Sequence, residues 1–187
     1  MNLSTNKPRI INQPQLVEMD RVLVELDLLK RQSERLDLMN RLHGRMAGVL
    51  SLTGMIEAYS VWLMPQVPHE LIGYSNATRQ KKHLFCSGHG PNRRRAMAFA
   101  EQIIDNPVPF EGGCKNQDGH YAHKWIFESA DEAGILLILK DSQELSTAEI
   151  DLINASLVIL SDSLQRGLEY EELFERASND SLTGLSN

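Results

Sequence analysis

Apolar residues recur at three- and four-residue steps along the first part of the chain. The repeating positions are Leu16, Met19, Leu23, Leu26, Leu29, Leu36, Met39 and Leu42. Charged side chains fill the other faces, and Pro14 suits the first turn of a helix. The pattern predicts a long amphipathic helix over 13–43, suited to a coiled-coil or bundle seam, after a flexible polar N-terminus over 1–12.

The pattern changes after Gly44, which is expected to bend or end the first helix. A second, shorter helix is predicted over 45–56. In residues 58–64, Tyr, Val and Leu alternate with Ser and Trp, the period of two that is typical of a strand. Pro65 would close this strand.

Four further strands are predicted in the middle of the chain, over 71–74, 83–86, 121–129 and 134–140. The last of these contains the run Ile-Leu-Leu-Ile-Leu, which is apolar on both faces. A strand of this kind is buried on both sides, so we expect it at the centre of a sheet.

A helix over about 93–105 separates the two pairs of strands, with Asn92 as its N-cap. The following segment, 106–119, holds two prolines and three glycines and is predicted to be a loop.

The last helix is the best defined element in the sequence. Ser146 and Glu149 have the spacing of a capping box. The helix is predicted to run to about Ala177, a length of roughly 45–50 Å. Its apolar seam comprises Ile150, Ile153, Leu157, Leu160 and Leu164, continued toward the end by Leu168, Leu173, Phe174 and Ala177.

The order of these elements predicts an α+β fold, an antiparallel sheet with helices packed on one face, flanked by long N- and C-terminal amphipathic helices. Residues 134–173 resemble the end of a GAF domain, where a central strand and a capped helix lead into a helical linker. The resemblance implies a GAF-like sensor domain over 44–164 and a signalling helix over 165–179. A PAS-like fold is the alternative, although PAS domains usually place several short helices between their second and third strands.

Composition limits the cellular compartment that we expect for the protein. No run of about 18 apolar residues is present, and the N-terminus lacks the apolar core of a signal peptide. Two cysteines do not make a disulfide framework. We therefore expect a cytoplasmic protein with no membrane partner.

Charge is distributed unevenly about the net value of −6. Residues 71–100 contain no Asp or Glu, and their cations are Arg79, Lys81, Lys82, Arg93, Arg94 and Arg95. Pairing of these cations with the chain's own acids is the simplest expectation. A glycine-bearing loop also leads Arg93, Arg94 and Arg95 into a helix N-terminus, where backbone N–H groups favour anions. These arginines are candidates for binding a small anionic ligand or an acidic partner surface, and nothing indicates a nucleic-acid partner.

Two other groups of residues are candidates for binding. Cysteines and histidines gather in the middle of the chain, and a metal or haem could use Cys86, His89, Cys114, His120 and His123. Their spacing matches no common zinc motif, so ordinary buried or surface roles are the alternative. Tyr59 and Trp125 belong to a set of aromatic residues that would line a small-molecule pocket or, more commonly, fill the core.

The final eight residues, 180–187, resemble the entry motif of GGDEF domains, the catalytic domains of diguanylate cyclases. The family pattern D-x-L-T-G-L-x-N is matched by Asp180, Leu182, Thr183, Gly184, Leu185 and Asn187. Locally the segment predicts a turn capped by Asp180, with Gly184 as a helix breaker. The resemblance implies that a catalytic domain follows, which would use GTP and Mg²⁺ to make cyclic di-GMP.

These features together predict the input half of a signalling enzyme. The chain itself has no nucleophile elbow, P-loop or zinc-protease motif, so we expect neither catalysis nor a cofactor in these residues. Its partners would be a second copy, joined through the terminal helices, and its own GGDEF domain. The alternatives are a ligand-independent dimerisation scaffold and a Cys/His metal-binding domain.

Overall fold

The structure, a computed structural model, describes residues 13–106, 112–116, 118–129 and 132–183, and it divides the chain into two units, 1–41 and 42–187. The predicted flexible segment 1–12 lies outside the described residues. The elements are α1 (Gln13–Ala47), α2 (Leu52–Leu63), β1 (Leu71–Asn76), β2 (Lys81–Cys86), α3 (Gly90–Ile104), β3 (Gly112–Lys115), β4 (His120–Ser129), β5 (Glu132–Asp141) and α4 (Thr147–Thr183).

Helix α1 confirms the predicted N-terminal helix and extends it beyond Gly44 to Ala47. Ion pairs four residues apart, such as Arg21–Glu25 and Asp27–Arg31, support the helix along its exposed surface. Most of the large apolar side chains of the described part of the first unit are exposed, namely Leu16, Val17, Met19, Val22, Leu23, Val24, Leu26, Leu28, Leu29 and Leu36. An isolated helix of this kind is marginal in water.

Helix α2 replaces two predicted elements, the helix over 45–56 and the strand over 58–64, and both predictions were wrong. The Ser51 hydroxyl accepts a hydrogen bond from the Gly54 amide at 3.1 Å and starts the helix. The buried positions then follow three- and four-residue steps: Leu52, Met55, Ile56, Tyr59, Ser60, Trp62 and Leu63. A short, mostly apolar run fits both the period of a helix and the period of a strand, and its packing in the folded domain favours the helix.

The five strands form one antiparallel sheet in the order β2-β1-β5-β4-β3. Strand β5 is central, as predicted from its apolar run. Strand β3 lies in the segment predicted as a loop, and that prediction was wrong. The glycines that suggested a loop instead serve an edge strand, because Gly112 has a φ of +122° where the strand begins.

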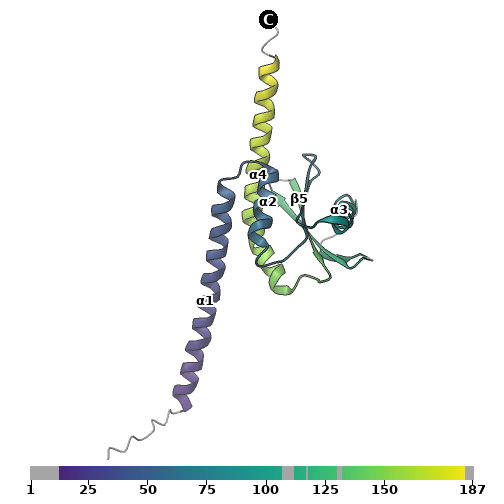
Figure 1. The fold of residues 1–187 in the computed structure, drawn as a ribbon. Coiled ribbons are helices and arrows are strands. Elements are labelled where there is room, and N and C mark those ends of the chain that lie inside the picture. The colour runs from purple at the N-terminus through teal and green to yellow at the C-terminus, as the bar shows by residue number, and fades with distance from the viewer. Residues whose placement is uncertain (1–12, 107–111, 117, 130–131, 184–187) are drawn as a thin grey trace, which may run out of the picture. The chain divides into compact units, whose positions relative to one another are not determined.

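Helices cover both faces of the sheet, which corrects the prediction that they pack on one face. Helix α3 lies on one face, and α2 and α4 lie on the other (Figure 1). The α3 side of the core includes a row of neighbours across four strands, Cys86, Leu71, Leu139 and Ala122, packed with Ala96, Ala100, Ile103 and Ile104. Helix α3 begins at Gly90 with His89 as N-cap, so Asn92 is not the cap.

Helix α4 begins with the predicted capping box. Glu149 accepts hydrogen bonds from the amide and hydroxyl of Ser146 at 2.7 and 2.9 Å, and the Ser146 hydroxyl accepts one from the Glu149 amide at 3.3 Å. The helix continues for 37 residues to Thr183, about 55 Å. Within the described part of the chain, no helix is both long and apolar enough to cross a membrane.

A buried histidine joins α2 to the start of β1. His69 donates its Nδ1 hydrogen to the Val67 carbonyl at 2.6 Å and accepts at Nε2 from the Ser60 hydroxyl at 2.8 Å. Burial lowers the pKa of His69; the bond to Val67 opposes this shift, and nearby Lys140 adds to it. The neutral ring is therefore the form that fits the folded protein.

This histidine makes stability depend on pH. Below its ordinary pKa of about 6.5 the unfolded chain takes up a proton that folded His69 does not, so stability falls as pH drops. We expect His69 to remove about 1 kcal/mol from the free energy of unfolding between pH 7.5 and 5.5. Urea denaturation of the protein and of His69→Gln at both pH values measures this, and an equal pH slope in the two proteins would contradict it.

Candidate functional site

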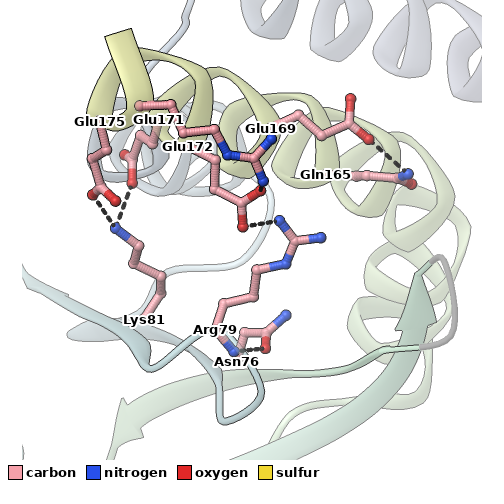
Figure 2. A network of polar contacts seen from close by, with 9 residues as sticks. Asn76, Arg79, Lys81, Gln165, Glu169, Glu171, Glu172 and Glu175 are labelled. Carbon is pink, nitrogen blue, oxygen red and sulfur yellow. Dashed lines mark hydrogen bonds and ion pairs between the residues drawn. The ribbon is translucent and has the colours of Figure 1, made fainter. Parts of the chain in front are cut away.

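Charged residues of the β1–β2 hairpin contact the distal half of α4. Lys81 Nζ lies 3.2 Å from Glu171 Oε2 and 3.3 Å from Glu175 Oε1, and Arg79 pairs with Glu172. Figure 2 shows the two cations reaching from the hairpin toward the three carboxylates on one side of the helix. We call this set, Arg79, Lys81, Glu171, Glu172 and Glu175, the hairpin–helix clamp.

Local sequence explains how the hairpin presents its cations. The Asn76 side chain accepts a hydrogen bond from the Arg79 amide at 3.0 Å, which fixes the turn at the end of β1. Gln80 then adopts a φ of +53°, and the chain returns as β2. On α4, Glu171 and Glu175 are four residues apart and therefore share a face, so one lysine reaches both.

Glu171 connects three elements. Its Oε1 accepts a hydrogen bond from the Leu52 amide at 3.1 Å, at the first position of α2, while its Oε2 faces Lys81. A carboxylate at a helix N-terminus is favoured by the helix dipole and satisfies an otherwise free amide. The hairpin, α2 and α4 thus meet at one side chain.

Three members of the clamp are more sheltered than the ion pairs of α1. The side chains of Arg79, Glu171 and Lys81 are 21, 26 and 30% exposed, whereas Glu172 and Glu175 are 38 and 64% exposed. Hydrogen bonds to Glu171 and Glu175 raise the pKa of Lys81, although desolvation acts weakly against them. These charges are partly exposed, so salt still screens them, although less than it screens the ion pairs of α1.

A second ion pair anchors the start of α4 to the sheet. Lys140 at the end of β5 is buried, and its Nζ lies 2.7 Å from Glu149 Oε1. Burial alone would raise the pKa of Glu149, but hydrogen bonds from Lys140 and Ser146 lower it below its ordinary value. The helix is therefore attached to the sheet by charges near both ends of its packed region.

A pocket of about 370 Å³ lies between the β3–β4 edge and the start of α4. Its lining includes Tyr121, His123, Leu145 and Ile150, with Lys115 and Glu144 supplying charge. The His123 ring packs against the Trp125 ring in a tilted arrangement with 4.3 Å between the ring centres, and Lys115 Nζ lies 4.8 Å from the centre of the Tyr121 ring. Its size and mixed apolar and polar lining suit a small molecule.

The two predicted aromatic residues are core residues outside this pocket's lining. Tyr59 is fully buried in α2, and its hydroxyl donates to Ser156 Oγ at 2.7 Å. Burial raises the pKa of Tyr59, so the phenol stays protonated. The Trp125 indole nitrogen donates to Asn154 on α4 at 2.9 Å.

The predicted Cys/His set is not brought together. Cys86 and Cys114 lie at opposite edges of the sheet, separated by the row of β1, β5 and β4 side chains, and burial raises the pKa of Cys114. His89 is exposed at the start of α3, and His120 Nε2 lies 3.3 Å from Glu70. Among the described residues, no three His, Cys, Asp or Glu side chains are placed to hold a metal ion.

The three candidate arginines lie on the exposed first turns of α3. Arg93 donates to the Cys86 carbonyl at 3.1 Å. Arg95 borders an open groove of about 700 Å³, with Phe99, Gln102 and Lys115 nearby. The carboxylate of Asp118 lines the same groove.

The other half of the basic stretch pairs with the chain's own acids, which was the simplest expectation from sequence. Arg79 and Lys81 contact α4, and Lys82 contacts Asp105 at 2.9 Å. Sequence reasoning identified the cations but missed that they face the acidic residues of the distal half of α4. The sequence does show basic residues in the hairpin and acidic residues near the end of the last helix, and this opposite charge could have suggested the contact.

The tail motif falls at the end of α4. The helix continues through Thr183, so the predicted turn at Asp180 was wrong. Asp180, Leu182 and Thr183 belong to the helix, while Gly184, Leu185 and Asn187 lie outside the described residues.

Comparison with known proteins found no matching family model and no matching curated sequence. One similar solved structure is the N-acylhomoserine lactone-dependent LuxR family transcription factor CepR2 from Burkholderia cenocepacia. It is 12% identical, has a TM-score of 0.47, and aligns over 73% of this chain and 96% of its own. A likeness this distant carries no argument about function.

Proposed function

We propose that this chain is the cytoplasmic regulatory input module of a diguanylate cyclase, acting as a homodimer that relays a signal through α4. The observation that carries the proposal is the helix itself. It is attached to the sheet at Glu149, packs on α2 at Gly167, and continues to Thr183, into the GGDEF-like entry motif that begins at Asp180. The GAF-like interpretation of the sheet domain supports the same role.

The distal half of α4 offers an unpaired apolar stripe. Tyr170, Leu173 and Phe174 are 46, 63 and 65% exposed, and Ala177 follows at seam spacing. Leu168, which the sequence placed in this seam, is buried in its own subunit. We propose that a second copy covers this stripe and that of α1, as in a coiled coil.

The relay would be geometric. Cyclic di-GMP synthesis joins two GTP molecules, so two catalytic domains, each holding GTP and Mg²⁺, must face one another. A rotation or shift of the paired α4 helices would set their approach. A small ligand could drive this motion only by binding the two helix arrangements with unequal affinity.

A fusion protein tests the proposal. Residues 1–187 are joined to a GGDEF domain that starts at its Arg after the entry motif, and cyclic di-GMP synthesis is compared with that of the isolated GGDEF domain. We expect at least a tenfold higher rate at 1 µM protein because the input module supplies the dimer. The same fusion carrying Leu173→Glu is the control, with a rate near that of the isolated domain. Equal rates for the unaltered fusion and the isolated domain would contradict the proposal.

A ligand-independent scaffold is the second candidate. Tyr59 of α2 and Trp125 of β4 are buried and hydrogen-bonded to α4, so they occupy space that a ligand beneath the middle of α4 would need. That packing favours a domain that dimerises without a ligand at this position. In the fusion, a scaffold would give constant activity, whereas a sensor would respond to its ligand.

A further inference from the structure

We infer that the hairpin–helix clamp is a switchable contact that sets the direction of the distal half of α4 relative to the sheet. The inference rests on the proposed function only for its consequence, namely that the direction of α4 matters to a following domain. The clamp itself is a property of residues 42–187 and is testable without that domain.

The position of the clamp supports this role. Gly167 and Leu168 are the last consecutive buried residues of α4, and Gly167 packs against Met55 of α2. The clamp begins three residues later, at Glu171. Beyond Glu175, the side chains of Arg176, Ala177 and Ser178 are exposed. The clamp therefore holds the helix at the point where apolar packing gives way to solvent.

The chemistry of the clamp allows it to open while the domain stays folded. Its bonds are ionic and partly exposed, so water and salt can replace them. The packing of α4 on α2 and β4 is instead held by buried apolar side chains and by the hydrogen bonds of Tyr59 and Trp125. Arg176 Nη2 lies 3.8 Å from Glu172 Oε2, while Arg79 pairs with Glu172 Oε1. A second cation therefore stays beside this carboxylate when Arg79 leaves it.

Opening would be communicated beyond the hairpin. When Lys81 releases Glu171, the carboxylate that accepts from the Leu52 amide loses the cation holding it in place. Strand β1 also lies between β2 and the central strand β5, so a shift of the sheet moves the hairpin and its two cations. The clamp thus links the sheet, the start of α2 and the distal half of α4.

The Leu52 amide provides a direct reporter. Its hydrogen bond goes to Glu171, whereas the neighbouring Gly54 amide bonds to Ser51 and serves as an internal control. We expect Arg79→Gln with Lys81→Gln to speed hydrogen exchange of the Leu52 amide about tenfold, measured by NMR on residues 1–187. Exchange at Gly54 and in β5 stays unchanged. Sodium chloride at about 0.5 M should speed Leu52 exchange in the unaltered protein and have little effect in the double variant.

Lys82→Gln is the matched control because it removes a hairpin cation that pairs with Asp105 outside the clamp. Unchanged Leu52 exchange in the double variant, or equal acceleration in β5, would overturn the inference. Sedimentation of the same samples separates the two proposals. A dimer with unchanged Leu52 exchange would contradict the clamp but not the dimer. A monomer with accelerated Leu52 exchange would contradict the dimer but not the clamp.

Discussion

Glu149→Ala is expected to lower the free energy of unfolding by about 4 kcal/mol, a large effect for a single substitution. The variant leaves the Lys140 ammonium buried without the carboxylate that lies 2.7 Å away. An unpaired buried charge costs about 3 kcal/mol, and the lost capping box adds about 1 kcal/mol. Urea denaturation at pH 7 followed by circular dichroism measures the change.

Removing both charges should restore most of this loss. Lys140→Met with Glu149→Leu leaves no buried charge, and we expect its stability to lie within about 2 kcal/mol of the unaltered protein. Because hydrogen bonds hold the pKa of Glu149 low in the folded state, the pair stabilises the protein above pH of about 4.5, and this stabilisation is lost as pH falls through the lowered pKa. The double variant should therefore lose less stability between pH 5 and 3. A loss below about 1 kcal/mol for Glu149→Ala would contradict this account of the anchor.

Leu173→Glu is expected to weaken dimerisation at least 100-fold, about 2.7 kcal/mol, while leaving the fold intact. The side chain is 63% exposed within one chain, so its loss should change the stability of the subunit by less than about 0.5 kcal/mol. In a parallel pair of helices, the carboxylates introduced in the two copies would face each other in an apolar seam. Sedimentation velocity measures association, and thermal unfolding measures the stability of the subunit.

Gln143→Glu is the control for the added charge, since residue 143 is exposed and precedes α4. It should leave association unchanged. If Leu173→Glu associates as strongly as the control, Leu173 is not part of the interface.

Sequence predicted the elements whose signals are local. The capping box at Ser146, the apolar run of β5 and the three- and four-residue period of α1 each specify a structure without help from distant residues. The strand predicted over 58–64 was wrong because a short apolar run fits both a helix and a strand. The cap at Ser51 and packing against α4 favour the helix. The loop predicted over 106–119 was wrong because glycines in this segment belong to an edge strand, β3, which pairs with β4.

The candidate site shows the same division. The cations Arg79 and Lys81 and the acids of α4 are visible in the sequence, but they are separated by about 90 residues, and only the fold shows which pairs form. Conversely, Cys86 and Cys114 both lie in the middle of the sequence, yet the strand order places them at opposite edges of the sheet. Long-range pairing follows strand order and helix direction, which local patterns do not specify.

Sedimentation equilibrium of the unaltered chain tests the central claim that paired terminal helices carry the signal. Across about 1–200 µM protein, we predict a mass of about twice 21.1 kDa, with a dissociation constant of about 0.1 µM or lower. A mass of one chain throughout that range would contradict the claim, because a single helix cannot bring two catalytic domains face to face.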